Sequence, residues 1–262
     1  MKSTSHIWTN KELNGDINYN QNIDEISRAN KWDSLLTSPQ WILFNPAEEV
    51  VQFYNNYLDS PSRQVRNRIN LTGKKVHDIG FGGGRHIYFF SEMGFDVTGS
   101  DLSETAITIT QAELAKRSLT ARLELCAMTR LPFKDGEFDI TISRSTINHA
   151  TLQDIKKTIF EIARTTKLGG LFFVTFISER SSEWKKGKEV VEDLSYIPNS
   201  GPEEGLIHTF LSATDVVALL EPFFRIEEMY LSEHPPLILN LSDANSKDTY
   251  FGSQHVVIGV RK

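Results

Sequence analysis

The sequence predicts an α/β protein built on a mostly parallel sheet. Three observations carry this prediction. From residue 74 onward, short apolar runs alternate with segments of helical periodicity; the first run leads into a glycine-rich loop; and the last two runs have no helix between them. Runs separated by helices indicate β-α-β units with parallel strands, whereas successive strands without a helix pair as an antiparallel hairpin. We therefore expect seven strands, helices on both faces of the sheet and an antiparallel C-terminal hairpin.

The predicted strands are short, and each is bounded by turn residues or by a helical segment. The run at 171–177 is apolar apart from Thr175, as expected where helices cover both faces of a parallel strand. The expected strands cover residues 75–79, 95–99, 122–126, 138–143, 171–177, 225–231 and 255–260.

Capping residues mark where most of the predicted helices begin. Ser103 precedes one helical pattern, and Thr151, with Asp154 three residues later, opens another that the pair Gly169-Gly170 is expected to end. Ser212 opens the last helix. The expected helices cover residues 86–93, 103–116, 151–169 and a segment that begins at Ser212.

Residues 1–73 are predicted to form an N-terminal helical extension, distinct from the domain at 74–262. Residues 1–44 are polar and rich in asparagine but contain three tryptophans, which need a surface to pack on. Asn45-Pro46 predicts a helix start, with asparagine as the N-cap and proline at the first helical position. We expect the extension to form a lid over the functional site, with Tyr19 or Trp32 reaching into it.

Composition excludes several classes of protein. Of the 262 residues, 39% are hydrophobic and 24% charged, which is typical of a packed domain. The net charge of −6 disfavours a protein that binds nucleic acid. The single cysteine, Cys126, allows no intramolecular disulfide and fits a reducing compartment. With neither a secretory signal at residues 1–8 nor an apolar run of about 20 residues, a cytoplasmic protein with no membrane partner is expected.

The segment with the most functional information follows the first predicted strand, at residues 76–86. It contains Asp78 and four glycines (Gly80, Gly82, Gly83 and Gly84) and leads directly into a helix. Glycines permit positive φ and close approach of a ligand, and the helix start offers unpaired N–H groups. A dinucleotide-binding loop would have a third glycine where Arg85 stands, and the lysine of an ATP loop is absent.

A carboxylate ends the second predicted strand. Asp101 lies about 20 residues after the glycine loop, where an acid can accept hydrogen bonds from the hydroxyls of a ribose. The glycine loop and Asp101 together therefore predict a site for an adenosine-containing cofactor.

These motifs resemble those of the class I S-adenosylmethionine-dependent methyltransferases. The resemblance extends over residues 74–262 and rests on four segments, at 78–84, 95–103, 131–139 and 169–173. It implies a Rossmann-like, seven-stranded, mostly parallel sheet with an antiparallel C-terminal hairpin, and S-adenosylmethionine as the cofactor.

The resemblance also assigns cofactor-binding roles by position. Ala127 is a departure, because many relatives carry an acid there. The implied residues are Asp78, Gly80, Phe81, Gly82 and Gly84 at the methionine end, Asp101 at the ribose, Leu102, Ala127 and Met128 around the adenine, and Ser143 after the fourth strand.

Candidates for the acceptor side of the site follow the fourth strand. His149 is a candidate general base, with a structural or substrate-orienting role as the alternative. Arg144 could bind a carboxylate of the acceptor or form a surface ion pair. By a looser resemblance, His208 lies near the acceptor pocket. The histidines show no paired metal-ligand spacing, so no metal site is expected.

The predicted function is methyl transfer to a small-molecule acceptor. A protein or nucleic-acid methyltransferase and a non-catalytic S-adenosylmethionine-binding protein are the alternatives. An NAD-dependent dehydrogenase is disfavoured by Arg85 and by the predicted hairpin. The sequence does not identify the acceptor or the accepting atom. It also leaves the oligomeric state open, and a homodimer is compatible with it.

Overall fold

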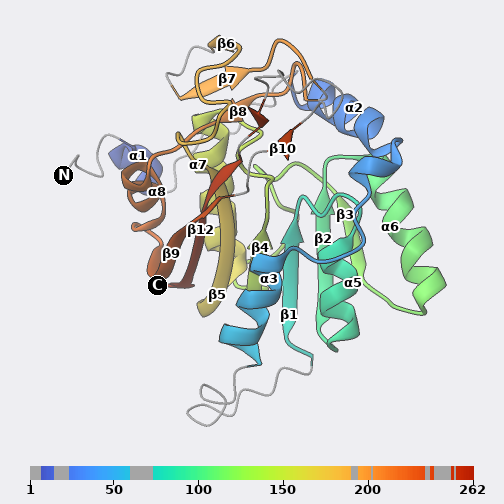
Figure 1. Cartoon of the computed structure of the whole chain (residues 1–262). Helices are drawn as coiled ribbons and strands as arrows, with labels where there is room; N and C mark the ends of the chain where they lie inside the picture. Colours follow the sequence, from blue (N-terminus) through green and yellow to red (C-terminus); the bar gives the residue numbers. More distant parts are fainter. Residues whose placement is uncertain are drawn as a thin grey trace.

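A computed structural model describes residues 7–14, 24–59, 73–189, 194–201, 203–233, 237–238, 249–250 and 252–262. Its central sheet has seven strands in the order β3-β2-β1-β4-β5-β12-β9 (Figure 1). These strands are β1 (Lys75–Ile79), β2 (Asp96–Asp101), β3 (Arg122–Leu125), β4 (Phe138–Ser143), β5 (Thr166–Ile177), β9 (Phe224–Glu233) and β12 (Ser253–Arg261).

Pairing within the sheet confirms the predicted fold class. β1 pairs in parallel with β2 and β4, β2 with β3, and β4 with β5. β12 is antiparallel to both β5 and β9. The C-terminal hairpin of β9 and β12 therefore joins the sheet through its last strand, β12, which pairs with β5. The strand order reverses between β1 and β4, and ligands of open α/β sheets bind at the carboxyl ends of strands at such a point.

Helices cover both faces of the sheet through two separate hydrophobic clusters. One cluster lies under α3, α5 and α6, and the other under α7 and α8. Neighbouring residues of β5 point to opposite faces, with Phe172 in one cluster and Phe173 in the other, as the two-residue repeat of a strand requires. The helices are α1 (Asn10–Leu13), α2 (Asp24–Leu36), α3 (Glu48–Phe53), α5 (Arg85–Glu92), α6 (Glu104–Arg117), α7 (Leu152–Thr165) and α8 (Ala213–Leu220).

Two predicted helix boundaries are wrong. α3 begins at Glu48 with Ala47 as its N-cap, so Asn45 does not cap it, and a π-helical turn, Tyr54–Leu58, continues it. α7 ends at Thr165 and not at Gly169-Gly170, which lie within β5. The chain already pairs with β4 at Thr166, opposite Phe138, because sheet pairing ends the helix before the glycines are reached.

The N-terminal extension packs on the sheet domain through α2. Asp33 of α2 accepts hydrogen bonds from the Ser103 hydroxyl (2.5 Å) and the Thr105 N–H (2.9 Å) at the start of α6. Arg28 of α2 forms a buried ion pair with Asp154 of α7 at 3.2 Å. α2 therefore bridges the N-termini of two helices at the edge of the sheet where β1 ends (Figure 1). Residues 60–72, between the extension and the domain, lie outside the described residues.

A small antiparallel sheet extends the same edge. It consists of β6 (Lys188–Glu189), β7 (Ser195–Ile197) and β8 (His208–Thr209), and Figure 1 places it near α2. Tyr196 and Phe210 pack with Ile177 at the end of β5, and Trp184 packs against them. A further strand pair is formed by β10 (Leu237–Ile238) and β11 (Thr249–Tyr250). Among the described helices, none has both the length and the apolar composition of a membrane span.

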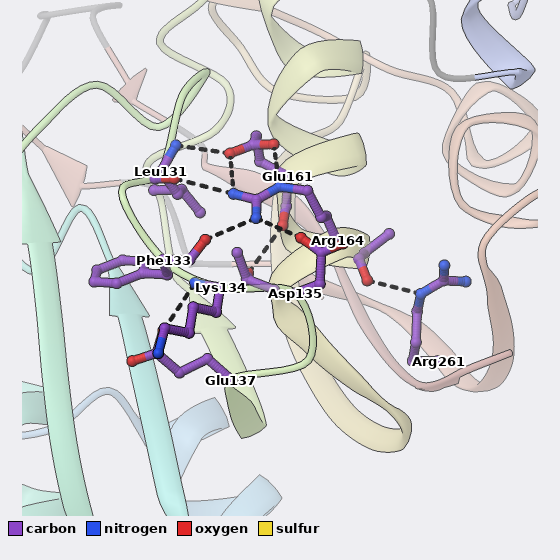
Figure 2. A network of polar contacts seen from close by, with 10 residues as sticks. Leu131, Phe133, Lys134, Asp135, Glu137, Glu161, Arg164 and Arg261 are labelled. Carbon is purple, nitrogen blue, oxygen red and sulfur yellow. Dashed lines mark hydrogen bonds and ion pairs between the residues drawn. The ribbon is translucent and has the colours of Figure 1, made fainter.

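The loop between β3 and β4 is fixed to α7 by one arginine. Figure 2 shows the Arg164 guanidinium at the centre of this network. It donates to the carbonyls of Leu131 (3.0 Å) and Phe133 (2.7 Å) and to the Glu161 carboxylate (2.8 Å). Glu161 in turn accepts from the Leu131 N–H at 2.7 Å. The network accounts for the loop's ordered path beside the sheet.

Candidate active site

A cavity of about 410 Å³ lies at the carboxyl ends of the parallel strands, within the usual size range for small-molecule sites. Four segments supply about half of its lining residues: the glycine loop, the end of β2, the loop after β3, and one face of α2. In that order their lining residues are Gly80, Phe81, Gly82 and Gly83; Ser100, Asp101 and Leu102; Ala127, Met128 and Thr129; and Glu25, Arg28, Trp32 and Leu36.

The glycines of the loop are required for different reasons. Gly80, Gly82 and Gly84 all have positive φ, at 69°, 55° and 81°. A Cβ on Gly80 would lie 2.1 Å from the Thr146 side chain, and a Cβ on Gly84 would lie 2.6 Å from the Tyr88 hydroxyl. A Cβ on Gly82 would meet no protein atom within 4 Å. Gly82 therefore lies on the open side of the loop, whereas Gly80 and Gly84 permit close packing.

Asp101 joins the glycine loop to the end of β2. Its carboxylate accepts hydrogen bonds from the N–H groups of Gly82 (2.8 Å) and Ser103 (3.0 Å). Burial raises the pKa of Asp101 to about 6, and the nearby charge of Asp78 adds to this effect. A carboxylate has about four acceptor positions, so Asp101 keeps capacity for donors in the cavity.

Charged groups surround the start of α5. Asp78 is buried, and neither of its carboxylate oxygens has a hydrogen-bond partner among the described residues; His86 Nδ1 lies 3.7 Å away. Arg85 and Arg144 both line the cavity. Burial, together with the charge of Arg144, lowers the pKa of Arg85 to about 10. Arg144 also contacts Glu49, at 3.7 Å. This end of the cavity thus offers two cations, with the buried carboxylate of Asp78 behind its wall.

Another part of the cavity contains histidines and glutamates. His149 is buried, with its ring edge-on to Trp32 at 4.9 Å between centroids and to His208 at 4.8 Å. Burial lowers the pKa of His149 to about 4. His208 lies between Glu203 (3.0 Å) and Glu183 (3.7 Å), and against the lowering effect of burial these carboxylates raise its pKa to about 9.

Most of the residues predicted from the sequence line this one cavity, but several do not. Ser143 is buried and donates to the Ile79 carbonyl at 3.1 Å, and His208 lies behind His149. Tyr19 is outside the described residues. The predicted residues on the wall are Gly80, Phe81, Gly82, Asp101, Leu102, Ala127, Met128, Trp32, Arg144 and His149, and those off it are Asp78, Gly84, Ser143 and His208.

The sequence prediction missed several lining residues. Glu25, Arg28 and Leu36 share one helix face with the predicted Trp32, a signal that the polar composition of this segment hides. Glu183 and Glu203 come from irregular segments around the small sheet, where no periodicity marks them.

Comparison with known proteins agrees with this geometry. Residues 77–174 match the methyltransferase domain family. A ubiquinone biosynthesis O-methyltransferase of Thiobacillus denitrificans is 30% identical over 47% of this chain and 52% of its own length. The enzyme of the same name from Coxiella burnetii is 31% identical over 59% of this chain and 63% of its own length. The match therefore spans only about half to three-fifths of these relatives.

Solved structures share the fold. An S-adenosylmethionine-dependent methyltransferase of Methanosarcina mazei superposes with a TM-score of 0.61, at 18% identity, over 78% of this chain and 97% of that one. Magnesium protoporphyrin IX methyltransferase of Synechocystis, solved with bound S-adenosylmethionine, gives 0.58 at 14% identity, over 94% and 100% of the two chains.

The strand order, the glycine loop with Asp101, and the match over residues 77–174 together give this part of the chain the fold and the sequence signature of the methyltransferase domain family. The residues present also fit the cofactor: the cavity is open above Gly82, Asp101 has free acceptor capacity for ribose hydroxyls, and Asp78 is a buried carboxylate without a hydrogen bond among the described residues.

Proposed function

We propose that this protein transfers the methyl group of S-adenosylmethionine to an oxygen atom of a small hydroxylated molecule. The observation that carries the proposal is the single cavity that joins the cofactor residues to the cluster of His149, Glu183 and Glu203. The names of the curated relatives, which are O-methyltransferases, support oxygen as the accepting atom.

The cofactor would be held along the carboxyl edge of the sheet. Asp101 would accept hydrogen bonds from its ribose, Leu102, Ala127 and Met128 would surround its adenine, and Gly82 would leave room for its backbone contact. Asp78 would balance the ammonium group of its methionine, and Arg85 and Arg144 its carboxylate. Bound in this way, the cofactor supplies an electrophilic methyl group on a sulfonium.

The acceptor would occupy the part of the cavity beside His149. The Trp32 ring offers an apolar surface against a flat molecule, and α2 would exclude water as a lid. Holding the two reactants in line can lower the barrier by up to about 7–11 kcal/mol. The general-base role expected for His149 stays a prediction. Because its pKa is lowered to about 4, the His149 ring is neutral at pH 7. A neutral ring can accept a hydrogen bond from the acceptor hydroxyl.

The other predicted attributes belong to the same proposal. The size of the cavity supports a small-molecule acceptor, and the net charge of −6 supports the absence of a nucleic-acid partner. A cytoplasmic location stays a prediction. The packing of α2 on the sheet supports the proposed division into an extension at 1–73 and a domain at 74–262. A homodimer is compatible with the proposed function.

Turnover with a panel of small acceptors tests the proposal. Formation of S-adenosylhomocysteine should require an acceptor with a free hydroxyl and should be absent with the matching O-methylated compound. Binding of the cofactor without turnover on any acceptor would instead favour the non-catalytic alternative. Turnover only with protein or nucleic acid would favour a macromolecular methyltransferase.

A further inference from the structure

Three side chains that are far apart in the sequence meet at the acceptor end of the cavity. His149 follows β4, Glu203 precedes β8, and His208 lies at the start of β8. Each offers one ligand atom, and the three atoms all lie within 4.8 Å of one another. The histidines that show no metal-ligand spacing along the chain are therefore brought together by the fold.

We propose that His149, Glu203 and His208 bind one divalent transition-metal ion, Zn²⁺ in the test below, with an open coordination position toward the acceptor. Two imidazoles and one carboxylate form a common ligand set for such ions, and catalytic sites of this kind combine three protein ligands with one open position. His149 and Glu203 line the cavity, so the open position would face it.

The distances suit a site that closes slightly around an ion. Two ligand atoms, each about 2.1 Å from one ion, lie about 3.0–3.4 Å apart. His208 Nε2 and Glu203 Oε2 are already 3.0 Å apart. In the metal-free chain this contact is an ion pair of the protonated His208 ring, and a metal ion would take the place of the shared proton. Only the widest pair of the cluster, at up to 4.8 Å, would have to approach.

His149 already has the outer contact that a metal ligand requires, and His208 has a carboxylate close to the position for one. A histidine ligand usually donates its second ring N–H to a carboxylate or a backbone carbonyl. Glu183 Oε2 lies 3.7 Å from Nδ1 of His208, the nitrogen turned away from Glu203. His149 has a hydrogen bond to the backbone of Ile207, whereas its Nδ1 is buried and without a partner among the described residues.

The charges balance as well. The carboxylates of Glu183 and Glu203 carry two negative charges, which a divalent cation would neutralise in place of the proton that His208 holds in the metal-free chain and would release on binding the ion. The binding of the ion does not depend on the proposed function. The catalytic role of the ion, however, rests on the proposed function. The ion would lower the pKa of an acceptor hydroxyl. The proton would pass to water, the oxygen–methyl bond would form, and the carbon–sulfur bond of the donor would break to leave S-adenosylhomocysteine.

Metal titration of the chelator-treated full chain tests the proposal. We expect one Zn²⁺ per chain by calorimetry. Loss of an outer partner of a ligand weakens metal binding by about 10–100-fold. Glu183→Gln, which removes such a partner of His208, should therefore weaken Zn²⁺ binding by this factor. Glu203→Gln, which removes a ligand, should weaken it by at least about 100-fold. Glu179→Gln, outside the cluster, is the matched control and should bind like the wild type. Equal affinity in Glu203→Gln, or no stoichiometric binding by the wild type, would overturn the proposal.

Two further readouts separate this proposal from misfolding and from the proposed function. Co²⁺-loaded protein should show a visible absorption band that His149→Gln alters, and each variant should keep its affinity for S-adenosylhomocysteine. If the wild type binds S-adenosylhomocysteine but no metal, the metal site is wrong and the proposed function stands. If it binds Zn²⁺ but not S-adenosylhomocysteine, the metal site stands and the proposed function fails.

Discussion

Trp32 of the N-terminal extension lies edge-on against His149 of the sheet domain, with ring centroids 4.9 Å apart and planes at 76°. This contact joins a residue of α2 to the loop after β4 across the acceptor end of the cavity. It gives a physical basis to the expectation of a lid, because the other lining residues of α2 face the same space.

If α2 acts as a lid, replacing Trp32 with a smaller side chain should weaken binding of the acceptor. Aromatic pairs contribute about 0.5–1.5 kcal/mol beyond the area that they bury. Trp32→Leu should therefore raise the KM for the acceptor by roughly two- to tenfold. Ile26→Ala, on an exposed position of the same helix, should leave KM unchanged. Deletion of residues 1–40 gives the stronger test, since unchanged turnover and unchanged acceptor affinity would reject the lid.

Gly82 and Gly94 form a matched pair of substitutions. Both have positive φ (55° and 84°), and a Cβ on either would meet no protein atom within 4 Å. Alanine should cost about 1–2 kcal/mol of stability at each position, because the left-handed conformation disfavours a side chain. Only Gly82 lines the cavity, so only Gly82→Ala should also weaken binding of S-adenosylhomocysteine. Equal binding by the two variants would show that the open side of the loop does not meet the cofactor.

Cofactor affinity should depend on pH through Asp101. Burial raises its pKa to about 6 in the free protein, and hydrogen bonds from ribose hydroxyls favour the ionised form. Binding therefore lowers the pKa and releases a proton. The affinity for S-adenosylhomocysteine should be constant above about pH 7 and fall as the pH drops through 6, by up to tenfold per unit. Calorimetry from pH 5 to 8 measures this, and Asp101→Asn should bind weakly without the same slope.

The Arg164 network predicts a large loss of stability for one substitution. Glu161 is only 3% exposed, and Arg164→Ala would remove the guanidinium that forms an ion pair with this buried carboxylate. Breaking such a pair costs about 3–5 kcal/mol. Arg164→Ala should lower the free energy of unfolding by this amount in a urea titration. Arg117→Ala, which removes the more exposed pairs with Glu92 and Glu113, should cost less than about 1 kcal/mol.

Much of the fold follows from local patterns in the sequence. The caps at Ser103, Thr151 and Ser212 all form as predicted, because each needs only residues three positions apart. The wrong end of α7 has the opposite cause. Pairing with β4 at Thr166 is a long-range contact that no local signal at Gly169-Gly170 reports.

The candidate site likewise has one part that local sequence patterns predict and one part that only the folded structure shows. The cofactor end lies on a continuous motif, so Gly82 and Asp101 could be placed from their spacing. The acceptor end depends on Glu183 and Glu203, which reach His149 only through the folding of segments after β5. His208 could be singled out in the sequence, but its position between two glutamates could not.

Calorimetric titration of the wild-type chain with S-adenosylhomocysteine and, separately, with NAD most directly tests the central claim, that the glycine loop and Asp101 hold an adenosyl sulfonium cofactor. One molecule of S-adenosylhomocysteine should bind per chain. Asp101→Ala should weaken that binding by roughly ten- to a hundredfold, the contribution of one charge-assisted hydrogen bond or more. NAD should not bind. An absence of binding by S-adenosylhomocysteine, or competition from NAD for the same cavity, would contradict the account.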